Sequence, residues 1–384
     1  MTPRPAILRP ATLAEARDAV RDAPGPLLFR GGGTKQGWGA QPEQVGTVID
    51  TTELDQLVEH SAGDMIAICA AGLRLSALQE TLAASGQWLA VDPPLADEGA
   101  TLGGVFATND HGPRRLRYGA PRDVVIGVTV VLADGSVARA GGRVVKNVAG
   151  FDLMRLLCGS FGTLGLITEL IVRLHPLPES SFTLTFGGDE AALTGLVLAL
   201  LASPVEPTAL DVAGGALWIR LEGRQAGVAS QARAIRVLAR SHRLTSGDQL
   251  EGEEEAGAWR RLGAAHDGAP GETIARATTL PDRLPQVAAA LAKVAPEATL
   301  ASHAGLGLHT ARFSSATHAG AVRAWRERVA ALGGTVVLRR HADGLSSPDD
   351  VWGPEPSAIR VMRRVKAALD PDRRCAPGRF VGGI

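Results

Sequence analysis

The stretch Leu27-Leu28-Phe29-Arg30-Gly31-Gly32-Gly33-Thr34 decides how this chain of 384 residues can fold. Its first half is apolar like a short buried strand, and it runs directly into three consecutive glycines. Because glycine lacks a side chain, such a loop leaves several backbone N–H groups free to converge on an anion. Phosphate is the natural ligand, although a glycine triplet by itself is also compatible with a simple turn.

The familiar phosphate-binding motifs are not satisfied by this loop. Lys35 comes before Gln36-Gly37-Trp38-Gly39, so the order Gly-x-x-x-x-Gly-Lys-Ser/Thr is not met, and neither is Gly-x-Gly-x-x-Gly. A second glycine-rich stretch, Thr101-Leu102-Gly103-Gly104, continues to Asn109, His111 and Gly112. Two such loops can clasp one diphosphate between their backbone donors.

Composition excludes several classes of function. Lys and Arg number 40, as do Asp and Glu, so the zero net charge does not favour nucleic acid or an anionic membrane surface. Cys69, Cys158 and Cys375 are too far apart for a disulfide framework, a zinc site or an iron–sulfur cluster, which indicates a reducing compartment. The N-terminus does not resemble a secretory signal, and the longest apolar runs fall short of the ~20 residues that span a bilayer. We therefore expect a cytoplasmic protein.

The pattern of apolar residues divides the chain into three parts. Residues 1–178 alternate short helices and strands, with a capping box at Thr12–Glu15 and a hairpin around Asp134-Gly135. Residues 181–354 show the order β-α-β-β-α twice, which predicts two ferredoxin-like half-units, although unrelated α+β segments can also alternate in this way. Residues 355–384 form a helix and a tail rich in proline and glycine.

Four motifs together resemble a known flavoprotein domain. They are Arg30–Thr34, Thr101–Gly104, Tyr118-Gly119 with Arg122-Asp123, and Gly159–Thr168. In this order they resemble the FAD-binding domain of the vanillyl-alcohol oxidase type, over residues 1–178. Gly112-Pro113-Arg114-Arg115 and the run from Lys146 to Asp152 resemble the FAD-binding E subunit of bacterial glycolate oxidase. The resemblance implies an α+β fold, with a two-lobed FAD-binding domain, a ferredoxin-like cap, and a tail that packs back on the FAD domain.

The resemblance also implies which residues hold the cofactor. The diphosphate would be held by Arg30, Gly31, Gly32, Gly33, Thr34, Thr101, Gly103 and Gly104. Asn109 and Gly112 would lie towards the ribityl chain and flavin ring, and Gly162, Gly165 and the main chain of Ile167 towards the adenosine. Gly162 and Gly165 also fit a tight strand entry, and Lys146 and Asn147 also fit a capped, solvated turn. Since the first loop contains no histidine, we expect the FAD to be non-covalent.

The second domain departs from the family's catalytic members. The resemblance implies that those members have a His-x-Gly-Asp-Gly-Asn-x-His run and a later Glu-His, which supply metal ligands and a catalytic base. This chain has His303-Ala304-Gly305-Leu306-Gly307-Leu308-His309 and Arg339-Arg340-His341 instead. Without a carboxylate this is a poor metal site, so we expect no metal and interpret His303 and His309 as ordinary buried or turn residues. No catalytic base is assigned.

Three further features carry weaker signals. Arg114, Arg115 and Arg117 can be a solvated cluster or an anion clamp. In the tail, Ala376 stands where the family usually has asparagine, which removes a side-chain contact to the flavin from that position. The neighbouring Cys375 is interpreted as a structural thiol.

These observations lead to one expected function and two alternatives. The expected protein is an FAD-carrying subunit of a glycolate oxidase that converts glycolate, a 2-hydroxy acid, to glyoxylate. Its partners would be a second flavin subunit and an iron–sulfur subunit, with no nucleic acid, and it would meet the inner face of the membrane only through the complex. The alternatives are a stand-alone FAD-dependent 2-hydroxy-acid dehydrogenase and a non-catalytic flavin-binding scaffold. Gly103→Val, expected to push a side chain into the diphosphate path, would separate the scaffold from an electron carrier.

Overall fold

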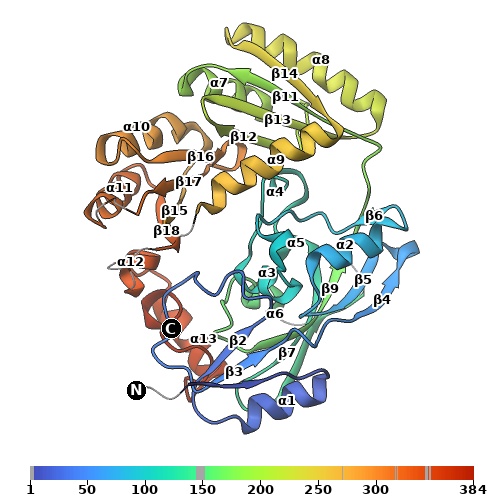
Figure 1. Ribbon diagram of the computed structural model, residues 1–384, viewed down its shortest axis with the longest axis vertical. Helices are drawn as coiled ribbons and strands as arrows, with labels where there is room; N and C mark the ends of the chain where they lie inside the picture. Colours follow the sequence, from blue (N-terminus) through green and yellow to red (C-terminus); the bar gives the residue numbers. More distant parts are fainter. Residues whose placement is uncertain are drawn as a thin grey trace. The chain divides into compact units, whose positions relative to one another are not determined.

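The computed structural model describes residues 4–143, 152–269, 271–315, 317, 319–341, 345 and 347–384. The chain divides into two compact units (Figure 1). The first unit comprises Met1–His111, Gly119–Leu177 and Ser347–Ile384, and the second comprises Gly112–Tyr118 and Pro178–Ser346. The C-terminal segment thus returns to the first unit, whereas the short piece Gly112–Tyr118 belongs to the second.

The first unit is built on two main sheets. A parallel sheet has the order β1-β3-β2, formed by β1 (Ala6–Leu8), β3 (Thr47–Asp50) and β2 (Leu27–Arg30). An antiparallel sheet has the order β4-β5-β9-β7-β8, formed by β4 (Leu57–Ser61), β5 (Ile66–Ala70), β9 (Leu166–Arg173), β7 (Val125–Val131) and β8 (Val137–Gly141). β7 and β8 form the predicted hairpin around Asp134-Gly135, which is confirmed.

Helices and short segments complete the first unit. They are α1 (Leu13–Asp22), α2 (Leu75–Ala83), α3 (Leu102–Thr108), α5 (Pro121–Val124), α6 (Leu153–Leu157), α12 (Pro348–Trp352), α13 (Ile359–Leu369), the two-residue strands β6 (Gln87–Trp88) and β10 (His175–Pro176), and the 3₁₀ turns η1 (Ala62–Asp64), η2 (Ala96–Glu98) and η5 (Val381–Gly383).

Capping and apolar periodicity explain where α1 begins and what it buries. The Thr12 hydroxyl accepts a hydrogen bond from the Glu15 N–H at 3.2 Å, as predicted from the capping box. Ala16 and Val20, four residues apart, are fully buried against Ile49 of β3 and Val131 of β7. α1 therefore packs on both sheets and holds β2, the strand that enters the glycine loop, in place.

The second unit is one antiparallel sheet of eight strands with the order β14-β11-β13-β12-β16-β17-β15-β18. Its strands are β11 (Ser180–Gly187), β12 (Ala209–Ala213), β13 (Ala216–Gly223), β14 (Thr245–Glu251), β15 (Thr273–Thr278), β16 (Thr299–His303), β17 (Leu308–Phe313) and β18 (Thr335–Arg340). Its helices are α4 (Arg115–Tyr118), α7 (Glu190–Leu201), α8 (Gln225–Ser241), α9 (Gly252–Asp267), α10 (Leu284–Val294) and α11 (Ala319–Ala331), with the 3₁₀ turns η3 (Pro281–Arg283) and η4 (Ala304–Leu306).

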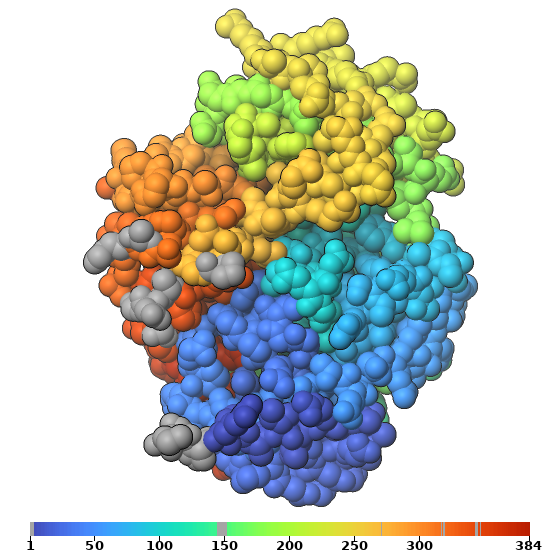
Figure 2. Space-filling view, in the orientation of Figure 1, coloured from blue at the N-terminus to red at the C-terminus, as the bar shows by residue number. Residues whose placement is uncertain are grey.

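Two β-α-β-β-α-β half-units meet where β12 pairs with β16, so the predicted ferredoxin-like repeat is confirmed. Along β11, Phe182 and Leu184 pack against α7 and α8, whereas Thr183 faces α9 on the opposite side of the sheet. The repeat did not predict α9, whose residues are gold in Figure 2. α9 adds a helix to the face that the repeat alone leaves open.

No helix of the described residues combines the length and the apolar character needed to span a membrane.

Candidate cofactor site

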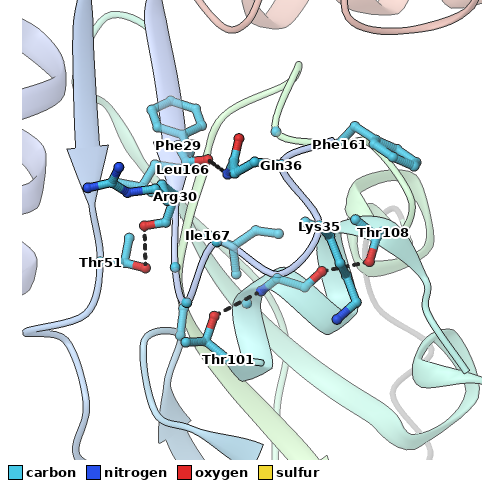
Figure 3. A pocket seen from close by; sticks show the side chains of 18 of the residues that line it. Phe29, Arg30, Lys35, Gln36, Thr51, Thr101, Thr108, Phe161, Leu166 and Ile167 are labelled. Atoms are coloured by element: carbon cyan, nitrogen blue, oxygen red, sulfur yellow. Dashed lines mark hydrogen bonds between the residues drawn. The ribbon is translucent and has the colours of Figure 1, made fainter. Parts of the chain in front are cut away.

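A pocket in the first unit is formed where the three glycine-rich stretches of the sequence come together (Figure 3). It lies at the end of β2, beside the start of α3 and the entry to β9. Its lining residues are Phe29, Arg30, Gly31, Gly32, Gly33, Thr34, Lys35, Gln36, Thr51, Ala71, Thr101, Gly103, Gly104, Ala107, Thr108, Phe161, Gly162, Gly165, Leu166, Ile167 and Arg379.

Glycine is required where the first two loops pack closely against each other. A Cβ on Gly31 would lie 2.1 Å from the Thr101 hydroxyl oxygen, and a Cβ on Gly32 would lie 1.8 Å from the carbonyl oxygen of Gly99. Gly33 differs, because it has a φ of +78° and no atom within 4 Å of the position of a Cβ. Gly31 and Gly32 thus allow the two loops to approach each other closely, whereas Gly33 leaves open space in the pocket.

Main-chain groups, more than side chains, form this face of the pocket. The Arg30 guanidinium binds the Asp50 carboxylate at 2.7 Å, and the Arg30 carbonyl accepts from the Thr51 N–H at 2.8 Å. Thr101 caps α3 and accepts a hydrogen bond from the Gly104 N–H at 3.4 Å, while the Thr108 hydroxyl donates to the Gly104 carbonyl at 2.7 Å (Figure 3). The N–H groups of Gly103 and Gly104 are therefore already bound, to the Ala71 carbonyl at 2.7 Å and to Thr101, and backbone donors for an anionic group would have to come from the Gly31–Gly33 loop.

Two buried cations also line the pocket. The Lys35 ammonium lies 3.3 Å from a carboxylate oxygen of Asp110, whose side chain is fully buried, and donates to the Thr34 hydroxyl at 3.2 Å. The Arg379 guanidinium donates to the Gln36 side chain at 3.1 Å and to the carbonyl oxygens of Lys35, Gln36 and Trp38 at 3.3, 3.2 and 3.4 Å. The pocket therefore combines backbone donors with fixed positive charge.

The structure brings together nearly all the residues proposed from the sequence. Arg30, Gly31, Gly32, Gly33, Thr34, Thr101, Gly103, Gly104, Gly162, Gly165 and Ile167 all line the pocket. Asn109 does not; it ends α3 with a φ of 48°, and its amide oxygen accepts from the Cys158 thiol at 3.3 Å. Gly112 belongs to the second unit. Lys146 and Asn147 lie outside the described residues.

Sequence reasoning did not assign ten of the lining residues to the site. They are Phe29, Lys35, Gln36, Thr51, Ala71, Ala107, Thr108, Phe161, Leu166 and Arg379. Seven of them lie within two positions of a predicted residue, so widening each motif by a residue or two would have found them. Thr51, Ala71 and Arg379 are distant in sequence from every motif, and of these only Arg379 has a signal, the return of the Pro-Gly-Arg tail.

Two expectations from the sequence are wrong. Arg114 is neither solvated nor an anion clamp, because its guanidinium is occupied by the buried Glu222 carboxylate, at 2.6 Å from Nη2 and 3.2 Å from Nε. A side chain on Gly103 would not enter open space: its Cβ would meet the Ala71 Cβ at 2.8 Å and carbonyl oxygen at 2.9 Å. Gly103→Val therefore disturbs the packing of α3 on β5 and is a poor probe of the pocket.

A second cluster of titratable groups is buried in the second unit, between β12, β16 and α9. Nδ1 of His303 lies 2.9 Å from the Asp211 carboxylate, and the ring of His266 stacks on that of His303 at 4.0 Å. Burial lowers the pKa of His266 to about 3 and that of His303 well below its usual range, so both are neutral. The same burial raises the pKa of Asp211.

Asp211, His266 and His303 have ligand atoms within 4.8 Å of one another, which raises the question of a metal. The carboxylate that the local sequence lacks is thus supplied by Asp211, 92 positions from His303. However, Nη2 of Arg276 lies 3.4 Å from Nε2 of His303. Because a guanidinium only donates, Nε2 accepts and Nδ1 carries the proton given to Asp211. With no lone pair on Nδ1 and a cation alongside, this hydrogen-bonded network does not fit a divalent metal.

His309 is engaged at both ring nitrogens as well. Nδ1 lies 2.9 Å from the Ser302 hydroxyl and Nε2 lies 2.9 Å from the Thr279 hydroxyl. Its side chain is buried, and burial lowers its pKa to about 4. These contacts give His303 and His309 structural hydrogen bonds and no common ligand position.

Comparisons with known proteins agree with this architecture. Residues 4–141 match the family model described as "FAD binding domain", and residues 196–380 match "FAD linked oxidases, C-terminal domain". The chain is 32% identical to the glycolate oxidase subunit GlcE of Escherichia coli (strain K12) over 253 residues, which cover 66% of this chain and 67% of that protein.

Two further similarities are more limited in coverage or identity. Over 151 residues the chain is 42% identical to a D-lactate dehydrogenase of Archaeoglobus fulgidus, covering 39% of this chain and only 33% of that protein. A solved structure of alkyldihydroxyacetonephosphate synthase has a TM-score of 0.75 and 17% identity, covering 97% of this chain and 75% of the other, and it supports the fold alone. The chain belongs to the FAD-linked oxidases, the flavoproteins whose FAD-binding domain is of the vanillyl-alcohol oxidase type.

Proposed function

We propose that the pocket of the first unit holds the diphosphate of FAD. The open glycine loop Gly31–Gly33 and the buried cations Lys35 and Arg379 support this placement, because a dinucleotide needs fixed donors and positive charge. Gly103 and Gly104 line the same pocket, and their N–H groups are bound to Ala71 and Thr101. When bound, FAD supplies the acceptor for the hydride that leaves the α-carbon of a 2-hydroxy acid. The residues of this chain bind and orient it.

We propose that the FAD is held without a covalent bond. The first glycine loop, Arg30–Thr34, contains no histidine, and none of the described residues that line the diphosphate pocket is a histidine, cysteine or tyrosine. Acid precipitation of the yellow protein tests this point. The colour is expected in the supernatant, and colour that stays with the pellet would contradict it.

We infer that the chain is the FAD-carrying subunit of a complex that oxidises glycolate to glyoxylate. Its similarity to the glycolate oxidase subunit GlcE over two thirds of both chains supports this role most directly. Cys69 and Cys375 are buried, and with Cys158 they are the only cysteines of the sequence. Onward electron transfer therefore needs a partner with an iron–sulfur cluster, and a second flavin subunit completes the assembly.

A stand-alone dehydrogenase for a 2-hydroxy acid is the second candidate. The 42% identity to a D-lactate dehydrogenase over 151 residues favours it, although that stretch covers a third of the relative. Against it stands the second unit, where both ring nitrogens of His303 and of His309 are engaged by Asp211, Arg276 and hydroxyl groups, so neither imidazole is free to act as a catalytic base.

One experiment separates these candidates. The purified chain is reconstituted with FAD, and glycolate or D-lactate is added under anaerobic conditions, with and without co-expressed partner subunits. Bleaching of the flavin absorbance only in the assembly is the expected result. Bleaching of the isolated chain favours the stand-alone enzyme, and no bleaching of its flavin in an active assembly favours a scaffold.

A further inference from the structure

Arg379 is a buried cation with no carboxylate partner among the described residues. The residue is 4% exposed, and its guanidinium donates to the amide oxygen of Gln36 and to three backbone carbonyls. Among the described residues no acidic side chain pairs with it, and its Nε has no acceptor. A buried charge is costly unless an opposite charge compensates it.

The surroundings hold the guanidinium firmly in this position. The carbonyl oxygen of Arg379 accepts from the Trp352 indole N–H at 3.1 Å, and Trp352 packs on Phe161, a lining residue of the pocket, with ring centroids 5.0 Å apart. Phe380, the next residue in the chain, also contacts both rings. Burial lowers the pKa of the Arg379 guanidinium to about 10, so the group still carries its positive charge at neutral pH.

The other cations that line the pocket are already compensated, Arg30 by the Asp50 carboxylate at 2.7 Å and Lys35 by Asp110. Lys35 lies 3.3 Å from the fully buried Asp110 carboxylate, so this pair adds no net charge. Arg379 lines the same pocket, and its positive charge is the one that remains uncompensated. An anionic ligand of the pocket is therefore the counter-charge that the described part of the chain does not provide.

We propose that Arg379, from the C-terminal segment, is a cofactor-site residue whose charge is neutralised by the diphosphate of the bound dinucleotide and whose N–H groups fix the Lys35–Trp38 turn. This inference rests on the proposed placement of FAD in the pocket. The C-terminal segment then contributes to cofactor affinity directly as well as to the fold.

The test compares four proteins, the wild type and the variants Arg379→Met, Arg379→Lys and Arg374→Met. Arg374 is the matched control, because its guanidinium also binds backbone carbonyls, those of Ala23 and Ala133, but does not line the pocket. Each apoprotein is titrated with FAD by flavin fluorescence, and with ADP and adenosine by thermal shift. Adenosine lacks the diphosphate and so reports binding without the charge.

The expected result is FAD and ADP binding about 30-fold weaker or more in Arg379→Met, the factor that corresponds to a lost buried charge pair. Adenosine binding is expected to change little, and Arg379→Lys is expected to stay within about 5-fold of the wild type. If Arg379→Met does not fold, Arg379→Gln replaces it. Equal effects in Arg379→Met and Arg374→Met, or equal loss of ADP and adenosine, overturn the proposal.

Wild-type binding distinguishes a failure of the proposed role of Arg379 from a failure of the proposed FAD site. If wild-type protein binds FAD and the Arg379 variants match it, the role of Arg379 is wrong while the FAD site stands. If the wild type binds neither FAD nor ADP, the placement of the cofactor itself is wrong.

Discussion

The buried lysine of α13 gives the sharpest test of how the tail supports the cofactor loops. The Lys366 ammonium is almost fully buried and donates to the carbonyl oxygens of Thr163 and Cys375 at 2.7 and 2.8 Å, and to the Asp370 carboxylate at 2.6 Å. Thr163 lies in the loop that leads into β9, and Cys375 forms an isolated bridge with Leu27 of β2. One ammonium thus joins the tail to a cofactor loop.

Lys366→Met removes all three bonds and leaves the Asp370 carboxylate buried without its cation. Breaking a buried ion pair from one side costs about 3–5 kcal/mol. The backbone N–H groups of Arg374 and Cys375 still donate to Asp370, at 2.8 and 2.7 Å, so we expect about 3 kcal/mol, the lower end. This is a large part of the ~5–15 kcal/mol that stabilises a typical protein.

Urea denaturation of the apoprotein, followed by circular dichroism, measures how much the free energy of unfolding falls in Lys366→Met. The control is the double variant Lys366→Met with Asp370→Asn, which removes the unpaired charge. It should recover at least about 1 kcal/mol of the loss, because the two residues are in contact and their effects do not add. A loss below about 1 kcal/mol in Lys366→Met would refute the idea that this ammonium is a buried link.

Two further predictions concern the pocket and the second unit. Gly33→Ala places a methyl group in open space at a φ of +78°, so it should cost only about 1 kcal/mol of stability and yet weaken FAD binding. Gly103→Val, by contrast, should lower the melting temperature before it affects the pocket. Thermal melts and FAD titration compare the two variants. Because burial lowers the pKa of His309 from 6.5 to about 4, the unfolded chain binds a proton in that range that the folded chain does not, and stability should fall as the pH falls. For His309 this amounts to about 2 kcal/mol between pH 7.5 and 5, measured by urea denaturation, and the slope should be smaller in His309→Gln; an equal slope contradicts it.

Local signals in the sequence were sufficient for much of the fold. The capping residue Thr12, the Asp134-Gly135 turn and the repeated β-α-β-β-α pattern predict elements that the structure contains, because caps and turns act over a few residues. The glycine loops likewise predict the pocket, because the absence of a side chain is a property of the sequence itself.

The tertiary structure alone decided which distant groups compensate one another. Arg114 pairs with Glu222, Asp211 with His303, and Arg379 with the Lys35–Trp38 turn, across separations from 92 to 344 residues. Nothing in the local pattern around any of these residues specifies its partner, since the interaction depends on where the chain returns after many intervening elements. Charge and hydrogen-bond compensation acts through space, so only the folded arrangement determined whether these groups are bound to each other or face a ligand.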